Sequence, residues 1–141
     1  MKVMTVMGTR PEIIKLSRIT PLLDKYFDHT IVFTNQNYTP EMSSIFFKDM
    51  KVRKPDYNLK IKTGQYGSEV ADIIKKSHDV MIKEKPDLLF LLGDVNSGLS
   101  ALSAANLGIK ITHIEAGMRS YDSRMPEERN RKIIDHLSSV N

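Results

Sequence analysis

Short apolar runs alternate with stretches of helical periodicity along the whole chain. The apolar runs are typical of buried strands and cover residues 2–7, 29–34, 87–92 and 110–115. Helical stretches lie between and after them, over residues 10–23, 68–84 and 100–107 and from residue 127 onward. This alternation predicts βαβ units, and therefore an α/β fold with a Rossmann-like parallel sheet flanked by helices.

Residues that start or stop helices support these boundaries. Thr9 and Glu12 fit a capping box before a single helix that we expect to run to Leu23. Ser68 is expected to cap the long helix, and Pro86 to stop it. Gly108 is expected to end the helix before the last strand. The stretch between the second predicted strand and the long helix is less regular. We expect a loop over residues 35–40, then a short helix that ends at residue 47, and a short strand near residues 57–61.

Composition narrows the class of protein. With 141 residues, of which 40% are hydrophobic and 27% charged, the chain suits one globular domain. It has no cysteine, which excludes disulfides and thiolate metal sites. The apolar start of the chain is too short for a signal peptide, and no run reaches transmembrane length, so we expect a cytoplasmic protein without a membrane partner. The last helix has barely begun when the chain stops at Asn141, which predicts that 1–141 is an incomplete, N-terminal part of a larger fold.

The net charge of +4 leaves nucleic acid, anionic membranes and anionic small molecules open as partners. Most lysines are scattered, and the densest basic stretch, residues 48–54, is interrupted by apolar residues and an aspartate. We interpret that stretch as a solvated surface loop rather than a nucleic-acid patch. An anionic small molecule is then the partner class that the charge favours.

Polar residues follow three of the predicted strands directly. Arg10, Asp94 and Glu115 all fall at the carboxyl ends of strands, which is where open parallel sheets bind ligands. Each has an ordinary structural alternative: Arg10 as a surface residue at a helix start, Asp94 as a helix cap, Glu115 as a strand-end charge facing water. Their predicted convergence in one crevice favours a functional site.

The first of these turns is predicted to bind an anion. We expect free backbone N–H groups of Gly8, Thr9 and Arg10 at the start of a helix. The guanidinium group of Arg10 would lie beside them, and Lys15 follows one helical turn later. The turn lacks the further glycines of a dinucleotide fingerprint and the Gly-Lys-Ser/Thr of a P-loop. A diphosphate bound here would therefore suit a nucleotide-sugar.

A second polar cluster runs from Arg119 to Arg131. Glu127 and Arg131 are four residues apart and share a helix face. The pattern alone slightly favours a surface ion pair between them, and the alternative is a carboxylate held at the crevice by an arginine. His113 is interpreted as a buried, hydrogen-bonded core residue, because the other histidines form no metal-ligand spacing with it.

Four motifs in register give the chain a family resemblance. The sequence resembles the non-hydrolysing UDP-N-acetylglucosamine 2-epimerases through residues 8–12 with Lys15, residues 93–94 after an apolar strand, residues 113–119 and residues 125–131. These motifs span nearly the whole chain. The resemblance implies a two-domain fold of the glycosyltransferase-B kind, with two Rossmann-like domains facing each other across a cleft. It implies a homodimer that interconverts UDP-GlcNAc and UDP-ManNAc and needs no metal and no nicotinamide.

The same resemblance assigns roles to residues of this chain. It implies that the catalytic acids and bases are Asp94, Glu115 and Glu127, with Glu115 and Glu127 the main candidates for proton handling. It implies that Arg10, Lys15 and Arg131 hold the departing diphosphate. The family's catalytic histidine and most of its uridine contacts lie in a second domain that this chain lacks, so we expect the chain alone to be inactive.

Other functions remain open on the sequence. The family's Gln-His-Arg activator loop is replaced by residues 35–42, so the resemblance does not extend to activation by substrate. That loop is closer to relatives that act on modified sugars, of the UDP-N-acetyl-fucosamine and diacetamido-uronate types. A glycosyltransferase donor domain and a non-catalytic nucleotide-sugar binding module are further alternatives.

Overall fold

The computed structural model describes residues 1–35, 40–62 and 64–141, and no side chains of residues 40–44. The expected loop over 35–40, with the activator segment, therefore lies largely outside the described residues. The strands form one parallel five-stranded sheet in the order β3-β2-β1-β4-β5, with β1 Lys2–Met7, β2 Asp28–Phe33, β3 Tyr57–Asn58, β4 Leu88–Leu92 and β5 Lys110–Ile114. The predicted Rossmann-like sheet is confirmed.

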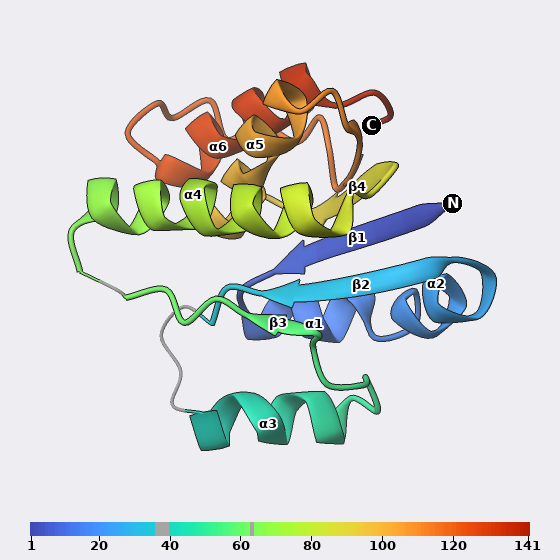
Figure 1. Cartoon of the computed structure of the whole chain (residues 1–141). Coiled ribbons are helices and arrows are strands. Elements are labelled where there is room, and N and C mark those ends of the chain that lie inside the picture. The colour runs from blue at the N-terminus through green and yellow to red at the C-terminus, as the bar shows by residue number, and fades with distance from the viewer. Residues whose placement is uncertain (36–39, 63) are drawn as a thin grey trace.

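Helices cover both faces of this sheet (Figure 1). One layer contains α1 Arg10–Leu16, α2 Thr20–Tyr26 and α3 Pro40–Asp49. The other contains α4 Tyr66–Glu84, the 3-10 helix η1 Asn96–Ser100, α5 Ala101–Asn106 and α6 Pro126–Leu137. Among the residues that the structure describes, no helix combines the length and apolar character needed to cross a membrane.

The strand period of two sends alternate side chains to these two layers. In β2, Val32 joins the apolar cluster under α4, α5 and α6, whereas Ile31 and Phe33 join the cluster under α1 and α3. Leu91 and Leu92 of β4 divide in the same way. Because both faces are buried, the strands are continuously apolar, which is why the runs were visible in the sequence.

Two helix boundaries differ from the prediction. The single helix expected to run to Leu23 is two helices, because Pro21 has no N–H to donate to the carbonyl of Ser17 and so cannot continue α1. Pro21 instead occupies the first turn of α2, where no such bond is needed. The long helix begins at Tyr66, with Gln65 rather than Ser68 as its N-cap.

The chain reverses its direction of travel across the sheet between β1 and β4. It moves from β1 outward to β2 and β3, then crosses back through α4 to β4 and on to β5. The carboxyl ends of β1 and β4 are therefore neighbours at a topological switch point, with the end of β5 beside them. Open α/β sheets bind their ligands at this place.

Candidate functional site

A small cavity of about 80 Å³ lies at the switch point. It is lined by residues that follow β1, β4 and β5, namely Thr9, Pro11, Glu12, Lys15, Leu92, Gly93, Asp94, Val95 and Glu115. Of the three residues predicted to converge, Asp94 and Glu115 line this cavity, together with Lys15, whereas Arg10 does not. Pockets that bury a drug-sized ligand measure about 300–1,000 Å³, so this cavity alone is too small to enclose one.

Lys15 and Glu115 form an ion pair across the cavity. The Lys15 ammonium donates to both carboxylate oxygens of Glu115, at 2.7 and 2.9 Å. Glu115 follows the last residue of β5 in the left-handed backbone region, with φ of 64°. That conformation costs about 1–2 kcal/mol for a residue other than glycine and recurs at functional sites. The carboxylate also lies against Gly93, where a Cβ would meet Oε2 at 3.8 Å.

Asp94 pairs with Arg131 of α6, so the two residues are joined across 37 positions of sequence. This pairing corrects the surface ion pair that the Glu127–Arg131 spacing favoured, because Arg131 is turned inward and only 9% exposed. Asn130 supports the same turn by donating to the Asp94 carbonyl at 2.9 Å. Arg131 therefore belongs to the site through Asp94.

The anion cradle predicted at the first turn is wrong for Gly8 and Thr9. Their backbone N–H groups donate to the side chain of Glu12, at 2.9 and 2.8 Å, and so are not free for a phosphate. The predicted capping box is present, but the Glu12 carboxylate itself fills the place of the anion. Its other oxygen accepts from Ser97 at 2.8 Å, which ties the turn after β1 to the segment after β4.

Glu12 is the most unusual titratable group near the cavity. Its side chain is buried, and burial raises the pKa of Glu12 even though hydrogen bonds from Gly8, Ser97 and Thr9 act in the opposite direction. The sequence pattern marks Glu12 only as half of a capping box. Its bond to Ser97 joins residues 85 positions apart, which a local pattern does not reveal.

Three predicted site residues, Arg10, Glu127 and Arg131, do not line the cavity, and only Arg131 pairs with a residue that does, Asp94. Arg10 is exposed, and its guanidinium lies 5.6 Å from the ring centre of Phe46 on α3. Glu127 is exposed in the first turn of α6 and forms no ion pair with any residue that the structure describes. Arg10 and Glu127 are thus exposed and lie outside the cavity lining.

The next residue of α6, Glu128, has a different role. It is buried, and it accepts from the backbone N–H of Ser120 at 2.8 Å and from Lys132. The Ser120 hydrogen bond and the Lys132 ammonium lower the pKa of Glu128. Its carboxylate therefore fixes the loop between β5 and α6, a role that the sequence pattern did not separate from that of Glu127.

The arrangement suits acid–base chemistry on an anionic ligand. Two carboxylates stand at adjacent strand ends, and each is neutralised by one cation, Glu115 by Lys15 and Asp94 by Arg131. An anionic ligand bound here would compete for these cations, which would leave the carboxylates able to accept or deliver protons. Within residues 1–35, 40–62 and 64–141, no three His, Asp or Glu side chains are grouped so that they could hold a metal ion.

Known proteins match this chain over nearly all of its length. The family model described as UDP-N-acetylglucosamine 2-epimerase matches residues 22–141. The chain is 46% identical over 140 residues to UDP-N-acetylglucosamine 2-epimerase of Methanococcus maripaludis, covering 97% of this chain and 37% of that protein. It is 41% identical over 143 residues to UDP-2,3-diacetamido-2,3-dideoxy-D-glucuronate 2-epimerase of Pseudomonas aeruginosa, covering 99% and 40%.

Solved structures agree with these matches. The crystal structure of Methanocaldococcus jannaschii UDP-GlcNAc 2-epimerase in complex with UDP-GlcNAc and UDP is similar with a TM-score of 0.93 and 45% identity. That similarity covers 99% of this chain and 39% of the crystallised chain. The chain thus spans about 40% of the length of the relatives that it matches.

Proposed function

The chain belongs to the UDP-N-acetylglucosamine 2-epimerase family, and we propose that it supplies half of the active site of an enzyme that interconverts UDP-GlcNAc and UDP-ManNAc. The other half comes from a second Rossmann-like domain, in a two-domain fold of the glycosyltransferase-B type. The observation that carries the proposal is the pair of neutralised carboxylates, Asp94 and Glu115, at the switch point of the sheet.

The reaction explains why carboxylates and cations are needed together. The proton at C2 of the sugar is not next to a carbonyl, so its removal requires assistance from departure of the UDP group. A carboxylate takes the C2 proton, the C–H electron pair forms the C1–C2 double bond, and the C1–oxygen bond breaks to release UDP. Reprotonation of the 2-acetamidoglucal on the opposite face and re-addition of UDP complete the inversion.

The geometry supports a division of roles among the residues of this chain. Glu115 lines the cavity with its carboxylate 2.7 Å from Lys15, and we assign it proton transfer at C2. Lys15 and Arg131, with Arg10 further out, hold the diphosphate as charge develops on it. Asp94 shares proton handling or anchors Arg131, and Glu127 joins the site from the exposed first turn of α6.

A modified UDP-sugar is the second candidate substrate. The similarity to the P. aeruginosa diacetamido-glucuronate epimerase is close to that with the relatives named for UDP-GlcNAc. The C2 chemistry is common to both, and the described residues at the cavity act on C1, C2 and the diphosphate. Substituents at C3 to C6 would be recognised elsewhere in the site.

Two further expectations belong to this proposal. The protein pairs with a second copy of itself, which sedimentation of the purified protein at several concentrations tests. It works in the cytoplasm, which fractionation of the source cells tests.

The decisive experiment is proton NMR of UDP-GlcNAc in deuterated water, with the chain extended by a second nucleotide-binding domain. We expect the C2 proton signal to disappear while a manno anomeric signal appears, because solvent deuterium enters C2 during reprotonation. A glycosyltransferase would leave C2 untouched. If folded protein leaves both signals unchanged, the same assay with a diacetamido-uronate substrate follows, and silence there favours a non-catalytic binding module.

A further inference from the structure

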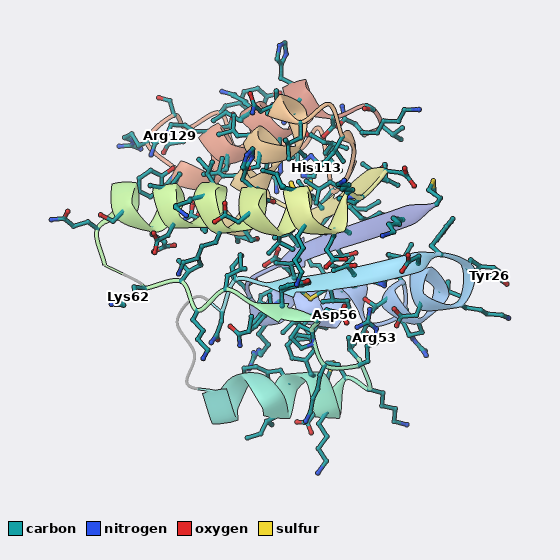
Figure 2. All side chains as sticks on the ribbon, viewed as in Figure 1. Tyr26, Arg53, Asp56, Lys62, His113 and Arg129 are labelled. Carbon is teal, nitrogen blue, oxygen red and sulfur yellow. The ribbon has the colours of Figure 1, made fainter. Side chains whose placement is uncertain are left out.

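A buried histidine connects the segments that carry the candidate site. His113 lies in β5 and is 1% exposed, and Figure 2 labels it within the body of the molecule. One ring nitrogen, Nε2, is 2.6 Å from the carbonyl oxygen of Gly93. The other, Nδ1, is 2.8 Å from a carboxylate oxygen of Asp135 in α6.

Both partners of the ring are hydrogen-bond acceptors. A peptide carbonyl can only accept, so the ring nitrogen that faces Gly93 must carry a proton. Asp135 also accepts at its second oxygen, from the Gly117 backbone at 3.1 Å and from Arg119 at 2.7 Å. A carboxylate with these donors is ionised, so the ring nitrogen that faces it must carry a proton as well.

The electrostatic surroundings are consistent with an ionised Asp135. Burial acts to raise the pKa of Asp135, but hydrogen bonds from Arg119, Gly117 and His113 outweigh burial and lower it. The ring pairs with Asp135 from α6, and Asp135 in turn pairs with Arg119 from the loop after β5. A buried cation without such a partner would be strongly destabilising, whereas one paired with a carboxylate is tolerated.

We propose that His113 is held as a doubly protonated imidazolium and that this cation positions the two turns that carry Asp94 and Glu115. The double protonation of His113 is inferred from its two hydrogen-bond acceptors. The effect of His113 on catalysis rests on the proposed function. A neutral imidazole would turn a lone pair toward one of the two oxygens and lose that hydrogen bond. His113 is a positioning residue because it acts through the turns.

The geometry specifies what is positioned. Gly93 is held twice by β5, since its N–H donates to the Ile114 carbonyl at 2.9 Å and its carbonyl accepts from His113. The next residue, Asp94, is thereby oriented toward Arg131. On the other side, Asp135 holds Gly117, which lies two residues after Glu115. One imidazolium–carboxylate pair thus fixes the ends of β4 and β5 relative to α6.

Ring protonation can be measured directly by long-range proton–nitrogen correlation NMR of the labelled protein, with the His113 signals identified by their loss in His113→Gln. We expect both ring nitrogens to be protonated at neutral pH. One unprotonated ring nitrogen in the folded wild-type protein would overturn the inference. This measurement needs no substrate, so it decides the inference even if the proposed function fails.

Asp135→Asn tests the counter-ion, with the exposed Asp79→Asn on α4 as the matched control. Without the carboxylate, we expect the His113 ring to be neutral and to keep the proton that faces Gly93. In the two-domain protein, kcat should fall by about tenfold or more with KM little changed, because loss of an orienting partner costs about 10–100-fold. An imidazolium that persists in Asp135→Asn, or an equal effect of Asp79→Asn, would contradict the proposal.

Discussion

At the residue scale, Glu12 has the largest predicted effect on stability. Its carboxylate accepts hydrogen bonds from Gly8, Thr9 and Ser97 in a buried position. Glu12→Ala leaves these donors unpaired, and each donor that water cannot reach lowers the stability by about 1–3 kcal/mol. We therefore expect the free energy of unfolding, measured with urea, to fall by at least about 2 kcal/mol.

Glu12→Gln is the matched control. The amide oxygen can accept from the two backbone N–H groups, and the amide nitrogen can donate to the Ser97 hydroxyl. We expect Glu12→Gln to stay within about 1 kcal/mol of wild type. Equal losses in both variants would mean that side-chain shape, not these hydrogen bonds, determines the effect.

The pH dependence of stability provides a separate prediction at Glu12. Because burial raises its pKa in the folded state, the folded protein binds the Glu12 proton more tightly than the unfolded chain does. The stability that this proton contributes is present below the unfolded pKa, near about 4.3, and is lost as the pH rises toward the raised folded value. Urea unfolding should therefore show wild type losing stability relative to Glu12→Gln as the pH increases from about 4. A difference that is constant with pH would contradict the raised pKa.

Glu115 is the residue whose loss should most reduce turnover. In the two-domain protein, Glu115→Gln keeps the size of the side chain but removes the base, and general bases contribute about 10²–10⁴-fold. We expect a loss of that size in the rate of deuterium incorporation at C2. Asp79→Asn, which changes an exposed carboxylate away from the cavity, should retain the wild-type rate. A Glu115→Gln rate within a few-fold of wild type would assign proton transfer to Asp94 or Glu127.

At the element scale, η1 and α6 pack so closely that one glycine is required between them. A Cβ on Gly98 would lie 2.5 Å from the terminal methyl of Ile134, which is fully buried. Gly98→Ala should therefore lower the free energy of unfolding by about 1–3 kcal/mol. Chemical denaturation measures this loss, and Gly67→Ala, whose Cβ would meet nothing within 4 Å, is the matched control.

The double variant identifies the cause. Ile134→Val removes the clashing methyl and alone costs about 0.5–1.5 kcal/mol. Combined with Gly98→Ala, the total loss should be smaller than the sum of the two single losses. Simple additivity would show that the cost of Gly98→Ala arises elsewhere than at α6.

The elements also show which parts of the fold the sequence could predict. Four of the strands agree with the predicted runs to within a residue, because strands buried on both faces are apolar throughout. The first helix was predicted too long because its apolar period continues across Pro21, and the missing backbone hydrogen bond overrides that period. Helix-start signals also placed the N-cap of α4 at Ser68, three residues after the observed N-cap, Gln65.

The sequence could predict only those residues of the candidate site that the fold class places at strand ends. Asp94 and Glu115 could be assigned to strand ends, but the pairing of Lys15 with Glu115 was not predicted. Their remaining partners come from pairings across elements, such as Arg131 with Asp94 and Ser97 with Glu12. A helical spacing rule connects only residues three or four apart, so it offered Glu127 as the partner of Arg131.

At the scale of the whole molecule, the candidate site is too small to enclose a ligand. The cavity at the switch point measures about 80 Å³, whereas a site that encloses a ligand of drug size or larger needs about 300–1,000 Å³. The chain also spans about 40% of the length of its relatives. The carboxylates and cations described above would therefore contact a nucleotide-sugar from one side and leave its other side in water.

An open half-site should bind weakly and fail to exclude water from the reacting carbons. We therefore expect the 141-residue protein alone to show no C2 deuterium incorporation into UDP-GlcNAc. Joining residues 1–141 to the remaining part of the M. jannaschii relative, which is 45% identical over this region, should produce incorporation. The same fusion with Glu115→Gln controls for activity that arises in the added part alone. Turnover by the 141-residue protein would show that these carboxylates work without a second domain, and an inactive but folded fusion would show that the two halves of the site are specific to each other.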